Sequence, residues 1–174
     1  MKRAALAVIS ALFAGLLSLG NALAKAPESC HGDLIRVHLG SFGGAGGQDG
    51  QAVVFTNRAH STCAVSGFPK FSAFTAAGSR VPVRFVTHTY LGGHPVKVVR
   101  IDPGKSASIL YDWQDAPSTK TGGGCVEVVK ITVGLRRELG GGGSWTLRTR
   151  DDVCQGMINV LPFTAGSDPS GFGS

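Results

Sequence analysis

Four cysteines carry most of the chemical potential of this 174-residue chain. A cysteine thiolate is a nucleophile and a metal ligand, but an even number of cysteines in an exported chain indicates disulfides. Zinc sites use C-x-x-C or histidine-rich spacings, and neither occurs here. We therefore expect two disulfides among Cys30, Cys63, Cys125 and Cys154. Three pairings are possible. We favour Cys30–Cys63 and Cys125–Cys154, because each pair joins near neighbours along the chain and each cysteine adjoins a predicted strand.

Two of the histidines offer a candidate metal site. His88 and His94 share one glycine-containing loop. A metal site requires three or four convergent ligands, and the sequence contains no such constellation. We therefore expect neither a metal nor another cofactor. An exported metal-binding domain that uses His88 and His94 stays as an alternative.

Familiar catalytic motifs are missing from the sequence. No G-x-S-x-G motif presents a serine nucleophile, and every cysteine has a plausible disulfide partner. Adjacent carboxylates occur at Asp151-Asp152. Neighbours on a strand point to opposite faces, so these two would not act together, and we expect them in an exposed turn. We predict no catalytic residue and no enzyme; an unrecognised extracytoplasmic enzyme is a further alternative.

The first 24 residues have the features of a signal peptide. Lys2 and Arg3 precede an uncharged, mostly apolar segment over residues 4–19, and Ala22 and Ala24 form an A-x-A cleavage pattern. The apolar segment is shorter than the roughly 20 residues that a membrane-spanning helix needs. We predict cleavage after Ala24. Cys30 lies too far from this segment to carry a lipid anchor, so we expect a secreted or envelope protein without one.

The rest of the chain is long enough for one domain. We place a single domain at 25–164 and expect the glycine-, serine- and proline-containing tail at 165–174 to be disordered. Without Lys2 and Arg3 the chain holds 15 basic and 11 acidic side chains, a net charge of +4. No run of Lys or Arg suits a phosphate backbone, so we expect no nucleic acid partner. We also expect a monomer without a membrane span after cleavage.

Extended segments recur throughout this domain. Residues 106–113 alternate between apolar and polar side chains, with Leu110 out of pattern, and residues 125–133 change phase, which indicates a bulge or burial on both faces. Asp102-Pro103-Gly104-Lys105 predicts a type II turn, and the glycine-rich residues 41–50 predict a loop. Further strands are predicted at 34–39, 51–56, 71–74, 81–87, 96–101, 145–149 and 157–163. This pattern favours an all-β, immunoglobulin-like antiparallel sandwich, with a small β-barrel as the alternative.

Several motifs resemble those of the DUF 4232 family, a domain of unknown function in exported proteins and lipoproteins of actinobacteria. Phe55-Thr56-Asn57 and Thr62-Cys63-Ala64-Val65-Ser66-Gly67-Phe68-Pro69 resemble its "ftN…tCtl.GyP" signature. Residues 102–107 are similar to its "l.PG.sA" turn, and Cys125 with Cys154-Gln155-Gly156 to its second cysteine pair. The resemblance covers about Cys30 to Pro162. It implies a secreted sandwich with two disulfides, and it implies no reaction.

These observations together predict an exported, non-catalytic domain. Loops cluster at the two ends of a sandwich and are suited to recognition. We therefore expect the loops to bind a cell-envelope component, a host protein or a small molecule. In the signature stretch, we expect Asn57 to stabilise a turn, Gly67 to adopt an unusual backbone angle and Phe68 to enter the core.

Overall fold

The computed structural model of the chain describes residues 27–117, 124–136 and 142–169, so the predicted signal peptide lies outside the described residues. These residues contain a short 3-10 turn, η1, and no α-helix. The elements in chain order are β1 (Glu28–Ser29), η1 (Gly32–Leu34), β2 (Ile35–Ala45), β3 (Gln48–Asn57), β4 (Cys63–Ser66), β5 (Lys70–Thr75), β6 (Arg80–Val81), β7 (Val83–Phe85), β8 (His88–Thr89), β9 (Gly92–Gly93), β10 (Val98–Ile101), β11 (Ser106–Gln114), β12 (Cys125–Leu135), β13 (Gly143–Val160) and β14 (Thr164–Ala165).

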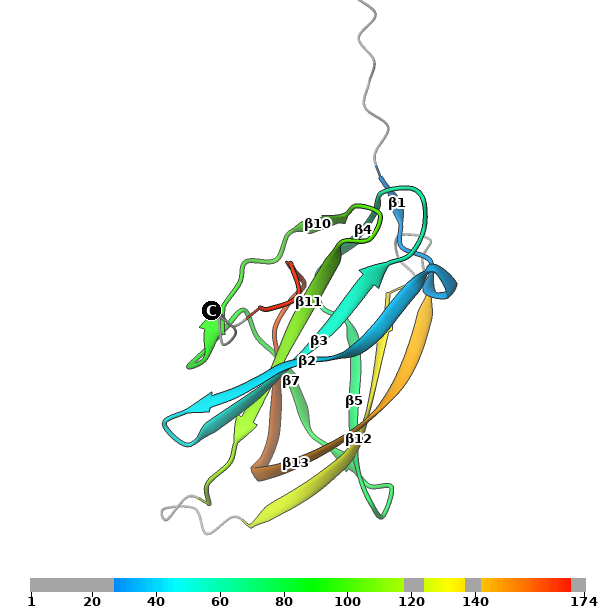
Figure 1. The fold of residues 1–174 in the computed structure, drawn as a ribbon. Coiled ribbons are helices and arrows are strands. Elements are labelled where there is room, and N and C mark those ends of the chain that lie inside the picture. Colours follow the sequence, from blue (N-terminus) through cyan, green and yellow to red (C-terminus); the bar gives the residue numbers. More distant parts are fainter. Residues whose placement is uncertain (1–26, 118–123, 137–141, 170–174) are drawn as a thin grey trace, which may run out of the picture.

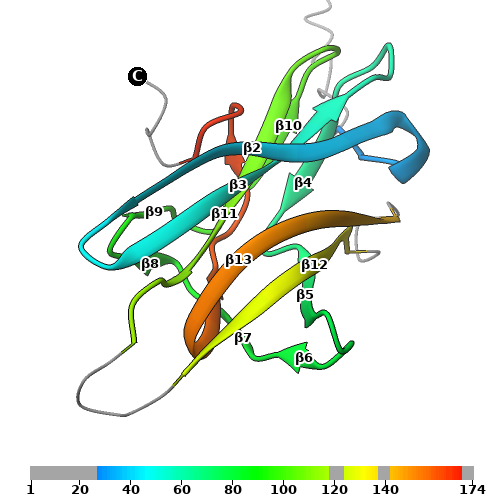
Figure 2. The ribbon, with the colours of Figure 1, turned by 60° about the horizontal axis from the view of Figure 1, so that its bottom comes forward.

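Most of the strands form one sheet that folds over on itself (Figures 1 and 2). Hydrogen bonding joins them in the order β2-β3-β11-β13-β12-β5-β6, with β7 beside β13 and β14 beside β11. All of these ladders are antiparallel except the pair of β7 with β13. The end strands β2 and β6 do not pair with each other. The result is the two-layered all-β sandwich that the sequence predicts, and not the closed barrel.

Strand β13 connects the two layers. Its first part pairs with β12, and its last part pairs with β11, as the orange strand in Figure 1 shows. We expected two separate strands, 145–149 and 157–163, but one strand runs from Gly143 to Val160. The chain turns at Gln155 and Gly156, whose φ angles are 61° and 65°. Two residues in the left-handed region bend the strand without ending its hydrogen bonding, which is the effect of a bulge.

The main core lies between the layers. One layer contributes Phe55, Ile109, Tyr111 and Trp113, and the other contributes Phe71, Ile131 and Val133. The alternation predicted for residues 106–113 is therefore confirmed, because the odd-numbered positions face this core. A register shift between Val128 and Lys130 confirms the bulge predicted from the change of phase.

Leu110 is out of pattern because it belongs to a second, smaller core. This side chain is on the outer face of β11, where it packs with Leu91 and Leu161 and against Val86. Leu91 lies in the connection between β8 and β9, so this small hairpin covers the outer face of the sheet. Both faces of β11 are therefore buried.

The C-terminal segment also packs on the layer that contains β11. Residues 165–169, which we expected to be disordered, pack on the sheet: β14 pairs with β11, and Pro169 is buried. The hydroxyl of Ser41 donates to Asp168 at 3.1 Å, and His94 Nε2 donates to the Pro169 carbonyl at 2.7 Å. Residues 170–174 lie outside the described residues.

The glycine-rich stretch 41–50 is mostly strand and not the loop we expected. β2 continues to Ala45 and β3 begins at Gln48, so a two-residue turn of Gly46 and Gly47 joins them. Their φ angles of 62° and 82° suit a tight hairpin, because two-residue hairpin turns favour positive φ at both positions. The glycines that favour a loop in the sequence are therefore the residues that allow this hairpin to close.

The signature residues stabilise turns, as the sequence predicts, with one exception. Asn57 Oδ1 accepts a hydrogen bond from the Ala59 amide at 2.9 Å, and its Nδ2 donates to the Ile101 carbonyl at 2.8 Å. Gly67 has a φ of 69°. In the Asp102–Lys105 turn, Gly104 has a φ of 74°, as type II requires. Phe68, however, is only half-buried, and it contacts Phe85 instead of entering the core.

Candidate functional site: a groove between β5 and β7

All four cysteines form disulfides. Cys30 is bonded to Cys63 and Cys125 to Cys154, with Cα–Cα distances of 4.9 and 3.9 Å. This is the pairing that we favoured from the sequence. Cys125 and Cys154 occupy directly opposite positions on β12 and β13, so the bond crosses one ladder. No sulfur is left to act as a thiolate nucleophile or as a metal ligand.

The two candidate metal ligands have structural contacts. His88 is paired with Gly93 in the β8–β9 hairpin, and its ring lies against that glycine. His94 Nε2 donates to the Pro169 carbonyl, which holds the C-terminal segment. Among the described residues, no group of three or more His, Cys, Asp or Glu side chains is arranged to hold a metal ion.

Asp151 is buried on strand β13, and our expectation of an exposed turn for Asp151-Asp152 is wrong. Its Oδ2 accepts a hydrogen bond from the Tyr111 hydroxyl at 3.0 Å, and its Oδ1 accepts one from Thr149 at 2.7 Å. Burial raises the pKa of Asp151 above its usual value, although these two donors oppose the shift. Asp152 is exposed on the other face of the strand, so the two carboxyls do not form a pair.

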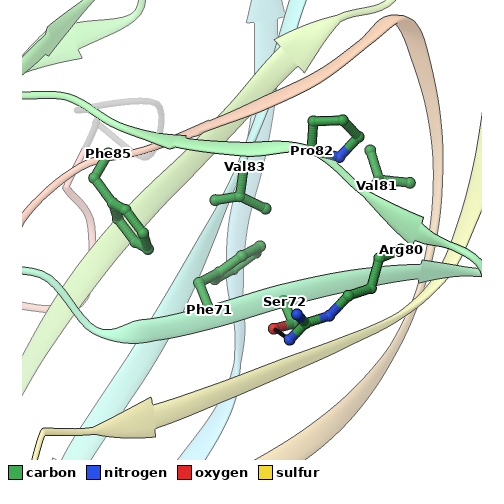
Figure 3. Close-up of a pocket in the computed structure, with 7 residues that line it drawn as sticks. All are labelled: Phe71, Ser72, Arg80, Val81, Pro82, Val83 and Phe85. Carbon is green, nitrogen blue, oxygen red and sulfur yellow. Dashed lines mark hydrogen bonds between the residues drawn. The ribbon is translucent and has the colours of Figure 1, made fainter.

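The chain creates a gap in the sandwich where it passes from one layer to the other. Arg80 and Val81 pair with β5, and Val83–Phe85 then pair in parallel with β13 in the facing layer. Pro82 stands between these strands. Proline cannot donate to a ladder, so it suits the point at which the chain leaves one sheet edge. The space between β5 and the crossing segment is a groove, which Figure 3 shows from close range.

Two adjoining cavities form this groove. One of about 380 Å³ lies between β5 and the crossing segment, and another of about 450 Å³ extends toward β12. They share Phe71, Ser72, Arg80 and Phe85. The described residues that line one or both are Pro69, Lys70, Phe71, Ser72, Arg80, Val81, Pro82, Val83, Phe85, Thr132, Val133, Arg136 and Ser144.

The floor and one wall of the groove are apolar. Phe71 is 8% exposed and packs on Tyr111, with ring centroids 5.2 Å apart. Phe85 is 40% exposed and rests on Phe68, with ring centroids 5.5 Å apart. In Figure 3, the side chains of Phe71, Val83 and Phe85 all point into the gap. The packing of Phe71 on Tyr111 and of Phe85 on Phe68 therefore supports the aromatic surface of the groove.

The rim of the groove is cationic. Lys70, Arg80 and Arg136 are exposed lining residues. Arg80 Nη2 donates to the Ser72 hydroxyl at 2.7 Å, and its guanidinium carbon lies 5.8 Å from the centroid of the Phe74 ring. Arg136 Nε donates to a main-chain carbonyl, that of Phe68, at 3.0 Å. These contacts hold two guanidinium groups at the entrance.

A chain of hydrogen bonds, which runs from the surface into the core, holds the crossing segment in place. Arg84 lies between the groove residues Val83 and Phe85, and its Nε and Nη2 donate to Asn159 Oδ1 at 3.0 and 2.8 Å. Asn159 Nδ2 in turn donates to Asp112 Oδ1 at 2.7 Å. Burial raises the pKa of Asp112, while donors that include Asn159 and the charge of Arg84 oppose the shift. This chain fixes β7, and with it one wall of the groove.

This site is not among the features that we predict from the sequence. Residues 71–74 and 81–87 are predicted as strands, and we expect recognition through loops. One signal was present: cations next to short apolar runs, at Lys70-Phe71 and Arg80-Val81, with a proline interrupting the second run. That pattern marks an edge, but it does not reveal which segment lies opposite.

Comparison with known proteins finds a family but no characterised relative. The family described as "Domain of unknown function (DUF4232)" matches residues 30–164. This range includes all four cysteines and every lining residue named above. No curated protein and no solved structure matches the chain.

Proposed function

The chain belongs to the DUF4232 family, and from that premise we propose that it is an exported, non-catalytic domain that binds a small ligand in the β5–β7 groove. The observation that carries the proposal is the apolar surface of Phe71, Val83 and Phe85, whose side chains point into the gap between β5 and the crossing segment. The groove takes the place of the loops as the site of recognition.

The two disulfides support export. Disulfides persist in oxidising compartments and are rare in the cytosol. The two bonds use every cysteine of the chain. Within the described residues there is no helix of the length and apolarity that crossing a membrane requires.

The dimensions and lining of the groove support binding. Small-molecule sites have volumes of roughly 300–1,000 Å³ and are lined by apolar and aromatic groups with a few polar ones. The two adjoining cavities, of about 380 and 450 Å³, fall in this range. Phe71 packs on Tyr111, and Arg84 anchors β7. Both walls of the groove are therefore ordered by the fold, and ligand binding would not carry the entropy cost of ordering them.

The residue types in the groove support a role without catalysis. Its described lining includes no Asp, Glu, His or Cys side chain. Ser72 is a possible nucleophile, but its hydroxyl already accepts a hydrogen bond from Arg80. Activation of a serine requires an adjacent base, and the groups beside Ser72 are cations.

Amide NMR of the oxidised protein with a panel of small aromatic and aliphatic molecules would test groove binding. We expect shift changes to concentrate at residues 70–72, 80–85 and 132–133. Phe85→Ala should weaken binding about tenfold, because it removes an aromatic wall. Tyr90→Ala is the matched control, since Tyr90 is 73% exposed and lines neither cavity. Shift changes centred elsewhere, or equal binding by Phe85→Ala, would contradict the proposal.

N-terminal sequencing of the protein recovered outside the cytoplasm would test export. We expect the mature chain to begin at Lys25, because the A-x-A pattern ends at Ala24. Recovery of the chain only from the cytoplasm, with residues 1–24 still attached, would contradict this part.

A further inference from the structure

The groove combines an apolar surface with a cationic rim. Its floor and inner wall are the apolar side chains of Phe71, Val83 and Phe85, and its rim holds Lys70, Arg80 and Arg136. None of the described lining residues is acidic. Neither Lys70 nor Arg80 forms a salt bridge with a described residue. The charges of Lys70 and Arg80 are therefore not neutralised by the described lining residues of the groove.

Arg80 is held at the boundary between the two surfaces. Figure 3 shows its side chain reaching along β5 to Ser72, beside the gap into which Phe71, Val83 and Phe85 point. The bond to Ser72 uses one of the five N–H donors of the guanidinium group. A planar guanidinium is suited to two parallel hydrogen bonds with a carboxylate, sulfonate or phosphate.

Neither surface alone provides tight binding. An ion pair at a solvent-exposed site contributes little, because water screens it and two side chains must be ordered. An apolar molecule in an open groove buries only part of its surface against the protein, so it gains only part of the hydrophobic stabilisation. A molecule with both features gains from both, since the acidic group stays at the wet rim while its apolar part covers Phe71 and Phe85.

We propose that this groove selects amphiphilic anions, in which one acidic group is joined to an apolar ring or chain. The inference rests on the proposed function, because it takes the groove to be the binding site. It adds the chemical class of the ligand. The net charge of +4 that is left without Lys2 and Arg3 would assist the approach of such an anion.

A pair of fluorescent probes tests the charge requirement. Anilinonaphthalene sulfonate and phenylnaphthylamine share the same ring system and differ in the sulfonate group. We expect the oxidised protein to bind the sulfonate at least tenfold more tightly, and added salt to weaken the binding of that probe alone. Dodecanoate should displace the sulfonate probe better than dodecanol does, which would extend the result from rings to chains. If neither dodecanoate nor dodecanol displaces the sulfonate probe, the ligands are limited to acids that carry a ring. The part of the proposal that concerns acids with an apolar hydrocarbon chain would then be overturned.

Charge-removing variants locate the effect. The double variant Lys70→Gln/Arg80→Gln should bind the sulfonate probe about tenfold more weakly than the original protein does. Its affinity for phenylnaphthylamine should be unchanged. Lys97→Gln/Arg100→Gln removes the same charge from exposed positions that line neither cavity, and it should behave like the original protein. Arg80→Lys keeps the charge and should retain most of the preference, and near-UV circular dichroism verifies that each variant is folded.

The outcomes separate this inference from the function it rests on. If the two probes bind equally tightly and Phe85→Ala abolishes the binding of both, the groove is a binding site but the proposed preference for anions is wrong. An equal loss in the two double variants would likewise overturn the anion site, because only the net charge would then matter. If Phe85→Ala changes the binding of neither probe, groove binding itself fails.

Discussion

The hydroxyl of Tyr111 donates a hydrogen bond to Asp151 Oδ2 at 3.0 Å and so joins β11 to β13 inside the sandwich. The same tyrosine ring supports Phe71, the floor of the groove, and it stacks on Trp113 with ring centroids 5.4 Å apart. Burial, and next the charge of Asp151, raise the pKa of Tyr111, so this tyrosine stays a neutral donor. One polar contact in the core therefore fixes the ring on which the groove rests.

Tyr111→Phe should lower the free energy of unfolding by about 1–3 kcal/mol. The change keeps the ring but leaves a buried carboxyl with one donor fewer, which is the costly case. Urea denaturation measures the effect. Tyr90→Phe removes a hydroxyl from a side chain that is 73% exposed, and it should change stability by less than about 0.5 kcal/mol. Equal effects in the two variants would mean that the bond to Asp151 contributes nothing.

Asp112→Asn should become more stable relative to the original protein as the pH rises from below 4. Burial raises the pKa of Asp112 in the folded state. A raised carboxyl pKa contributes stability below the unfolded value of about 3.9, and this contribution is lost as the pH rises through the folded value. Unfolding measured at a series of pH values gives the difference between the proteins. A difference that stays constant, or that moves the other way, would show that Asp112 ionises at least as easily in the fold as in the unfolded chain.

Removal of either disulfide should cost about 3–4 kcal/mol of stability, since each closes a loop of about 30 residues in the chain-entropy model. The paired variants Cys30→Ala/Cys63→Ala and Cys125→Ala/Cys154→Ala allow the two costs to be compared. Cys125 is exposed whereas Cys30 and Cys63 are buried, so a mild reductant should open the second bond first. Peptide mapping after alkylation identifies the opened bond. Labelling of Cys63 in the unreduced protein would contradict the bonded state of all four cysteines.

Gly156→Ala should destabilise the protein by about 1–2 kcal/mol. Gly156 has a φ of 65° at the bend of β13, and nothing lies within 4 Å of the position that a Cβ would take. The cost is therefore that of holding alanine in the left-handed region. Gly124→Ala is the control, because Gly124 has equally open space and no positive φ. A loss no larger than that of the control would mean that the bend does not depend on glycine.

His94→Ala should release the C-terminal segment while leaving the core intact. The variant removes the hydrogen bond to the Pro169 carbonyl. We expect faster hydrogen exchange at residues 164–169 and unchanged exchange in β12, which pairs with β13 and β5 and not with β14. His88→Ala is the control, and its hydrogen exchange at residues 164–169 should match that of the original protein.

A zinc or copper titration of the variants His94→Ala and His88→Ala tests the alternative of a metal-binding domain. Titration curves identical to that of the original protein would exclude this alternative.

Features that depend on near neighbours in the chain were predictable. Alternation along residues 106–113 reveals a strand with one face in the core, because side chains on a strand point to opposite faces in turn. The phase change in β12 predicts its bulge, and the proline and glycine of residues 102–105 predict their turn for similarly local reasons. The succession of extended segments and turns indicates the class of fold, and the order of the cysteines along the chain favours the pairing that the structure has.

Features that depend on which distant segments meet were decided by packing in three dimensions. No residue near Asp151 in the chain indicates that Tyr111 donates a hydrogen bond to it, so the sequence predicts an exposed turn where the structure has a buried, hydrogen-bonded carboxyl. Glycines 46 and 47 break or complete a strand depending on whether their flanks pair. The groove exists because the chain leaves β5 at Pro82 and joins β13 in the opposite layer, which brings Arg80 and Phe85 to one opening. Local patterns report how a side chain is oriented on its own strand, while a site arises from surfaces that only long-range pairing brings together.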